Sequence, residues 1–255
     1  MRIALIAVIL FAVGLPAAAQ SADAINADRP GLADSSGVVH KGMLQIEFGA
    51  QWEHRDGERT EFFPALFRVG ISNRLEARVE GNTFSSDDVN GRRSSGLAPA
   101  SIGFKYAFEA QHDRTPGVGV IARSFPAWGT GSFKPNQATA DVRVAADWEF
   151  TDGWTLNPNV GVGWYEGDPD HLWVGLIAAT LSYESRPGLS WFIDANGNFP
   201  EEQDGQAGIV ADAGVAWTPR PNFQLDVSAG TRVHGATPPQ PFIAAGLAIR
   251  SRPRP

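Results

Sequence analysis

Residues 74–84 read RLEARVEGNTF, with apolar and polar side chains at alternate positions. Leu75, Ala77 and Val79 fall on one face of an extended chain, because successive side chains of a strand point to opposite sides. The other face carries two arginines, two glutamates and Asn82. That face is too charged for the buried core of a soluble β-sandwich. The stretch therefore predicts a strand with one lipid-facing side and one side on a wet interior.

The same alternation recurs from end to end of the chain, as in residues 44–52, where Gln45 and Glu47 lie on the polar face, and in residues 140–150 and 223–230. We expect an all-β fold, a single closed antiparallel up-and-down transmembrane β-barrel of about 12 strands over residues 43–250. The expected strands are residues 43–52, 62–71, 74–84, 100–109, 117–125, 138–150, 154–165, 172–184, 189–199, 207–217, 223–234 and 241–250.

The expected connections alternate in length. The tight ones are residues 72–73, 151–153, 185–188 and 218–222, and the longer ones include residues 85–99 and 126–137, rich in glycine and serine. Outer-membrane barrels have short turns on one side and longer loops on the other. We therefore expect the turns and both chain ends to face the periplasm.

Tryptophan placement gives an independent indication. Seven of the eight tryptophans fall near ends of the expected strands, and only Trp128 lies within a loop. A soluble sandwich would bury its aromatic side chains in mid-strand. Tryptophans at strand ends are typical of the two aromatic girdles of a membrane barrel.

Two expected strands depart from simple alternation. Pro64 lacks the N–H that a sheet ladder needs, so we expect a bulge near it. Residues 172–184 are apolar on both faces, which leaves the facing of that strand open.

The N-terminus indicates export. Met1 and Arg2 precede an apolar run over residues 3–15, followed by Pro16 and three alanines. This pattern predicts a signal peptide over residues 1–19, and the run is too short to span a bilayer as a helix. The expected location is the bacterial outer membrane. The chain has no cysteine, so disulfides and a lipid-modified N-terminal cysteine are excluded. Its net charge of −7, without a basic cluster, gives no basis for nucleic-acid binding.

Residues 20–42 precede the first expected strand and are neither long nor apolar. Two interpretations stay open. The segment around Asp28-Arg29 folds into the barrel as a small plug or latch, or it is a periplasmic leader with a turn at Pro30-Gly31. Residues 251–255 form a short tail.

Charged side chains of both signs mark the expected inward faces. In a transporter they would form a polar lining that orients a solute. Alternatively, they pair across strands and fill a narrow lumen. Either arrangement requires pairing or water. The candidate lumen-lining residues are Arg68, Arg74, Glu76, Arg78, Glu80, Lys105, Arg123, Asp141, Arg143, Asp147, Asp194, Asp212, Asp226 and Arg232.

No other constellation indicates chemistry. The five histidines lack metal-ligand spacing, and no nucleophile elbow or phosphate loop is present. We therefore predict no catalytic residue, metal or cofactor. The cluster Glu201-Glu202-Gln203-Asp204-Gly205 suits either a site for a divalent cation bridging lipopolysaccharide or a solvated loop.

Several segments resemble one known family. Ile25–Pro30, Asp34–Ser36, Val38-Val39, Lys41-Gly42, Leu44–Glu47, Arg68–Glu76, Ser101–Tyr106 and Thr218–Asp226 are similar to segments of the family called putative MetA-pathway of phenol degradation. The resemblance covers most of the mature chain. It implies an outer-membrane barrel of transporter type, linked to aromatic compounds, with no catalytic residues to carry over. Such barrels tend to end on an aromatic residue, whereas this sequence reads Ile249-Arg250 before the tail.

Three functions are carried forward. The leading hypothesis is an outer-membrane channel or transporter for small molecules, including apolar or aromatic compounds. The alternatives are a barrel enzyme that modifies lipid, with serine, histidine and an acid at one rim, and a structural or adhesive barrel that functions through its loops. The expected partners are outer-membrane lipid and lipopolysaccharide, a small-molecule solute and the outer-membrane assembly machinery.

Overall fold

The computed structural model describes residues 24–29, 31–55, 57–167, 170–201, 207–235 and 239–251. The expected signal peptide, Glu202–Gly205 and residues 252–255 lie outside these ranges. Thirteen strands and one short 3-10 helix form in the described chain, and none of its helices is long and apolar enough to cross a membrane. The elements are β1 (Leu44–Arg55), β2 (Glu58–Gly70), β3 (Leu75–Val89), β4 (Arg92–Leu97), β5 (Ala100–Glu109), β6 (Gly117–Phe125), η1 (Gly131–Phe133), β7 (Thr139–Thr151), β8 (Trp154–Tyr165), β9 (Leu172–Arg186), β10 (Leu189–Pro200), β11 (Gly208–Arg220), β12 (Phe223–His234) and β13 (Phe242–Arg250).

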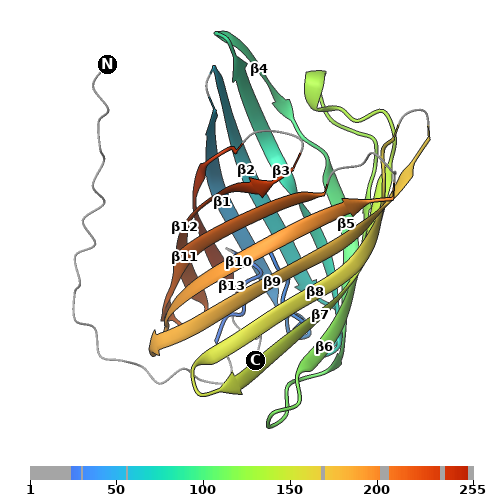
Figure 1. Ribbon diagram of the computed structural model, residues 1–255. Helices are drawn as coiled ribbons and strands as arrows, with labels where there is room; N and C mark the ends of the chain where they lie inside the picture. The colour runs from blue at the N-terminus through green and yellow to red at the C-terminus, as the bar shows by residue number, and fades with distance from the viewer. Residues whose placement is uncertain are drawn as a thin grey trace, which may run out of the picture.

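Twelve strands close into one antiparallel ring. β1 pairs with β13 as well as with β2, and β2 pairs with β3, so that neither end of the sheet is left open. Figure 1 shows the strands tilted around a common axis, as closure of a barrel requires. The predicted closed up-and-down barrel is confirmed, with β4 as an additional strand outside the ring.

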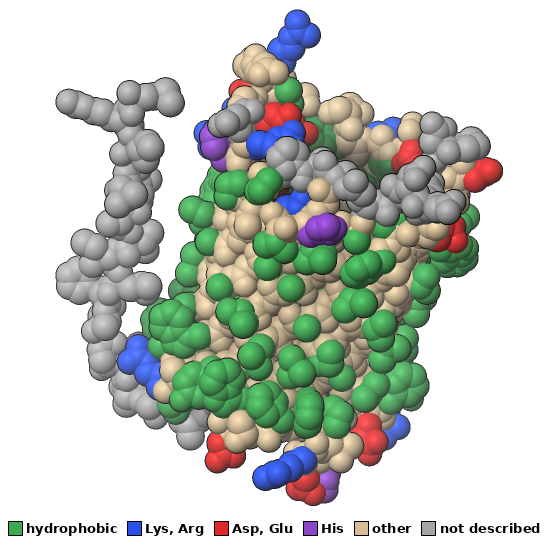
Figure 2. Space-filling model, viewed as in Figure 1, with side chains coloured by type: hydrophobic (Ala, Val, Ile, Leu, Met, Phe, Trp, Pro, Cys, Tyr) green, Lys and Arg blue, Asp and Glu red, His purple; other side chains and the backbone are tan. Residues whose placement is uncertain are grey.

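The outer wall is apolar. Phe48, Ile193 and Ile243 point outward and are exposed by 43%, 59% and 59%. Figure 2 shows hydrophobic side chains spread over the visible wall, with charged side chains gathered at its two ends. All eight tryptophans are exposed large hydrophobic side chains. An apolar band of this kind is stable against lipid, because exposing so much apolar surface to water is unfavourable.

The loop expected over residues 85–99 is instead a β-hairpin, which corrects the sequence prediction. β3 continues to Val89 and returns as β4, with six register pairs between them. Asn90 and Gly91 form the turn with φ of 52° and 79°. Asn-Gly tolerates positive φ at both positions, which a tight hairpin turn requires. Asn90-Gly91 is therefore the feature of the sequence that indicates this hairpin.

The two irregular strands behave differently. The predicted bulge is confirmed, because the β2–β3 register shifts between Phe62 and Pro64. In β9, Val174 and Leu176 are buried and point inward, whereas Ile177 is 54% exposed on the outer wall. Part of the lumen is therefore apolar, which is why alternation failed to assign this strand.

Candidate functional site: the barrel lumen

The chain before β1 lies inside the barrel. We call residues 24–29 and 31–42 the lumenal segment, drawn in blue within the ring of strands in Figure 1. It starts at the end of the barrel with the tight turns, which we call the turn rim, where Ile25 N donates to Pro221 O at 2.6 Å. It returns to that rim before β1, where Gly42 N donates to Gly70 O at 2.8 Å. The opposite end is the loop rim.

Asp28 is the centre of a buried charge cluster. Its carboxylate accepts from Lys105 Nζ at 2.9 and 3.0 Å and lies 3.1 Å from Arg78 Nη1 and 3.5 Å from Arg68 Nη1. The three cationic side chains are at most 2% exposed. They come from β2, β3 and β5, whose inward faces converge there. The segment thus supplies an anion to a wall rich in cations.

Arg68 joins the wall to the backbone of the segment. Its Nε donates to Glu76 Oε1 at 2.9 Å, while Nη1 and Nη2 each donate at 3.0 Å to the carbonyls of Asn26 and Gly37. Arg68 Nη1 also contacts Glu47 Oε1 at 3.2 Å. One guanidinium therefore fixes both arms of the segment, using the several donors that arginine offers.

Wall carboxylates accept hydrogen bonds from the segment's N–H groups. Glu47 accepts from Arg29 N at 2.9 Å and Glu76 from Val39 N at 2.8 Å. Asp147 and Asp194 accept from the N–H groups of Ser36 and Leu32 at 3.0 and 3.1 Å, and Asn159 Oδ1 accepts from Asp34 N at 2.9 Å. A buried backbone without secondary structure needs such partners. These inward side chains, four acids and Asn159, therefore accept the backbone hydrogen bonds that a sheet ladder would otherwise accept.

Two glycines make room for Arg29. Gly49 of β1 and Gly246 of β13 are opposite each other in register. A Cβ at Gly49 would lie 2.5 Å from Arg29 Cζ, and one at Gly246 would lie 2.5 Å from Arg29 Nε. The guanidinium rests on this bare patch and pairs with Asp226 at 3.2 Å. The wall is thus shaped to fit the segment.

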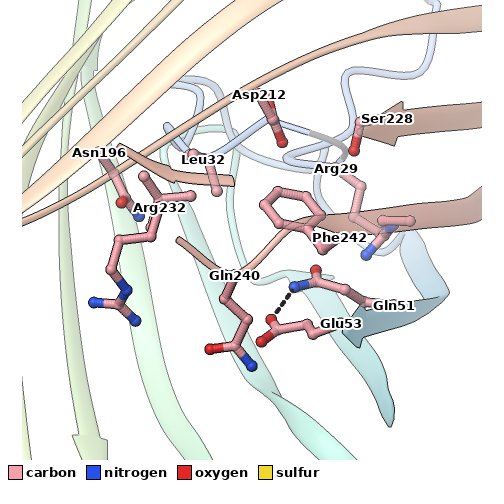
Figure 3. Close-up of a pocket in the computed structure, with 12 residues that line it drawn as sticks. Arg29, Leu32, Gln51, Glu53, Asn196, Asp212, Ser228, Arg232, Gln240 and Phe242 are labelled. Atoms are coloured by element: carbon pink, nitrogen blue, oxygen red, sulfur yellow. Dashed lines mark hydrogen bonds between the residues drawn. The ribbon is translucent and has the colours of Figure 1, made fainter. Parts of the chain in front are cut away.

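Two cavities lie on either side of the segment. The loop-side cavity, of about 210 Å³, is bounded on the side of the segment by Arg29 and Leu32 and is shown in Figure 3. The turn-side cavity, of about 380 Å³, is also bounded by Arg29 and reaches Gly153 and Thr218 at the turn rim. The segment therefore divides the lumen between two solvent-accessible chambers.

The structure places thirteen of the fourteen candidate lumen-lining residues on the inward side. Among them, Arg123 forms an ion pair with Asp141 at 2.7 Å and a second ion pair with Glu80. Arg74 is the exception, and its predicted place in the lumen is wrong. β3 begins at Leu75, so Arg74 lies in the preceding turn and is exposed, since alternation cannot fix where a strand ends.

Several lumenal residues were absent from that candidate set. Asp28 and Asp34 belong to the segment, where no periodicity indicates which side chains are buried. Glu47 is fully buried, and its place on the polar face of residues 44–52 already indicates that it points into the lumen. Inward apolar residues such as Ile121 and Phe192 gave no signal, because alternation predicts polar lumen positions.

Comparisons with known proteins agree with the fold. Residues 27–250 match the family model described as putative MetA-pathway of phenol degradation. An outer-membrane channel of the COG4313 type from Pseudomonas putida F1 has a TM-score of 0.62 at 12% identity, covering 85% of this chain and 98% of its own. The NanC porin has a TM-score of 0.60 at 9% identity, covering 80% and 98%. No curated protein matches the sequence.

Proposed function

Since the chain belongs to the putative MetA-pathway of phenol degradation family, we propose that it is an outer-membrane channel for small molecules whose lumenal segment is a movable plug. The observation that carries the proposal is the division of one closed barrel into two chambers by a segment without secondary structure. Hydrogen bonds to side chains hold this segment, and water can replace them when it moves.

The proposed location is the bacterial outer membrane, in contact with outer-membrane lipid and lipopolysaccharide after insertion by the assembly machinery. The exposed apolar wall and the exposed tryptophans support it. Transport of aromatic or other apolar compounds is proposed from the family description and from the buried apolar side chains Val174, Leu176 and Phe192 on the inward face.

A lipid-modifying enzyme is less well supported. Among the described residues, His171 Nε2 contacts the carbonyl of Ala138 and its ring stacks on Trp164, while His112 contacts only the adjacent Asp113 among acidic side chains. These contacts do not bring a serine, a histidine and an acid together at one rim. We therefore propose transport rather than catalysis.

A disulfide lock tests the plug. A Cβ at Gly31 would lie 3.0 Å from Thr180 Oγ1, and the natural chain has no cysteine, so the pair Gly31→Cys and Thr180→Cys would be its only thiols. That proximity suits a disulfide between the segment and β9. We expect stepwise conductance in planar bilayers from the natural protein, suppressed in the oxidised double variant and restored by reductant.

The single variant Gly31→Cys is the control for the loss of glycine. Equal conductance of the oxidised and reduced double variant, with the disulfide verified by mass spectrometry, would show that the segment is not a movable plug. A folded, inserted natural protein that never conducts would contradict the channel itself.

A further inference from the structure

The loop-side cavity contains a carboxylate without a counter-ion. Asp212 of β11 points into the cavity in Figure 3 and is 8% exposed. Its Oδ1 has no hydrogen-bond partner, and no ion pair reaches it among the described residues. A buried anion is costly without a partner, so this group is available to a positively charged ligand.

A second carboxyl group, that of Asp194, lies beside Asp212. Asp194 of β10 stands opposite Asp212 in register, and its Oδ1 is also without a partner. Its Oδ2 accepts from Leu32 N at 3.1 Å. The side chains of Asp194 and Asp212 hydrogen-bond to each other, which requires a proton on one of them, so the pair carries one negative charge. One negative charge matches the one positive charge of an organic cation such as an ammonium group.

Arg232 of β12 supplies the opposite charge to the same cavity. Its Nε is buried without a hydrogen-bond partner, and no acid lies within ion-pair distance of it in the described part of the chain, while Glu53, which lines the same cavity, attracts it electrostatically over a longer distance. Arg232 is opposite Val210, two residues from Asp212, and such diagonal neighbours are about 7–8 Å apart. Arg232 and Asp212 thus face one cavity without pairing with each other.

The remaining lining is apolar on one side. Leu32, Val210, Phe242 and Ala244 supply the apolar surface of the cavity. In Figure 3 the ring of Phe242 lies between Asp212 and Gln240. The cavity of about 210 Å³ corresponds to roughly seven waters at about 30 Å³ each. It suits a solute of amino-acid size with an apolar substituent.

We propose that the loop-side cavity binds a small zwitterion, with an ammonium group at Asp212, a carboxylate at Arg232 and an apolar or aromatic substituent against Phe242. Arg29, which also lines the cavity, already pairs with Asp226, so it does not compete for the solute carboxylate. The inference rests on the proposed channel function and names a solute class for it.

Three matched probes test the charge requirement: L-phenylalanine, phenethylamine, which lacks the carboxylate, and 3-phenylpropanoate, which lacks the ammonium group. Binding to the folded mature protein in detergent is measured by calorimetry. We expect phenylalanine to bind at least about tenfold more tightly than either analogue, because each charged hydrogen bond contributes to affinity.

Two variants assign each charge. Asp212→Asn should make phenylalanine and 3-phenylpropanoate bind equally, and Arg232→Gln should make phenylalanine and phenethylamine bind equally. Glu149→Gln in the turn-side cavity and Arg186→Gln at the exposed end of β9 are matched controls that should keep the preference.

Equal binding of all three probes, no binding by any of them, or an unchanged preference in Asp212→Asn would overturn the zwitterion site. Conductance of the same preparation separates this failure from that of the channel. A conducting protein without the preference loses only this inference, whereas a selective binder that never conducts loses only the proposed channel.

Discussion

Replacing Asp28 by alanine should release the lumenal segment from the barrel wall. Lys105 is fully buried, and Asp28 is its one ion-pair partner among the described residues. Breaking a buried ion pair from one side costs about 3–5 kcal/mol. The cost falls on the conformation with the segment in place, because water reaches Lys105 once the segment leaves. Taking the lower value, the ratio of displaced to seated segment should rise about 10²-fold, since about 1.4 kcal/mol is tenfold.

Single-channel recording of the folded variant measures this ratio as open probability. Adding Lys105→Met removes the cation that Asp28 alone had paired among the described residues, while Arg68 keeps Glu76 and Arg78 keeps Asp34 and Glu80. Replacing both members of a buried pair is often neutral, so the second change should reverse most of the increase in open probability. Asp152→Asn, at an exposed turn-rim carboxylate, is the control. The reasoning is refuted if Asp28→Ala has the open probability of the natural protein, or if Lys105→Met fails to reverse the increase.

Four further outcomes are expected. Gly246→Val should displace Arg29 from its bare patch and raise conductance without loss of barrel circular dichroism, because even a Cβ there lies 2.5 Å from Arg29 Nε. Arg143→Glu should shift the reversal potential in a salt gradient toward cation selectivity, since it places another acid near Asp141, now 3.3 Å from Arg143 Nη2. Gly91→Val should speed hydrogen exchange in the β3–β4 hairpin alone, because φ of 79° disfavours valine and the hairpin lies outside the ring. Brominated lipid should quench most of the tryptophan fluorescence, and weak quenching of the inserted protein would contradict the membrane-facing wall.

The barrel itself could be predicted from sequence because a half-buried strand has a two-residue period. The constraint is strongest in β3, where Leu75, Ala77 and Val79 face lipid and the charged side chains between them must point to the lumen. The same argument could not place Arg74, because the period continues past the end of a strand. It also could not detect β4, where the turn residues Asn90 and Gly91 carry the information.

The lumen was less predictable, because its partners come from a segment without periodicity. The sequence identified Arg78 and Lys105 as inward charges but gave no means of knowing that Asp28 pairs with both. The sequence could not decide between the plug and the leader interpretation of residues 20–42. A short polar segment is compatible with a solvated tail as well as with a hydrogen-bonded insert in the lumen. Only side chains brought together by barrel closure distinguish these two arrangements.

The charges of the segment match the asymmetry of the wall. Asp28 and Asp34 approach the side formed by β2, β3 and β5, with Arg78 within 3.1 Å of both, while Arg29 approaches Asp226 on the opposite side of the segment. Departure of the segment would remove anions from a cationic wall and a cation from an acidic wall. Each wall would then have to be hydrated, because buried unpaired charges are costly. Opening of a plug held by charge pairing therefore requires water to enter the buried contacts between the segment and two oppositely charged faces of the wall.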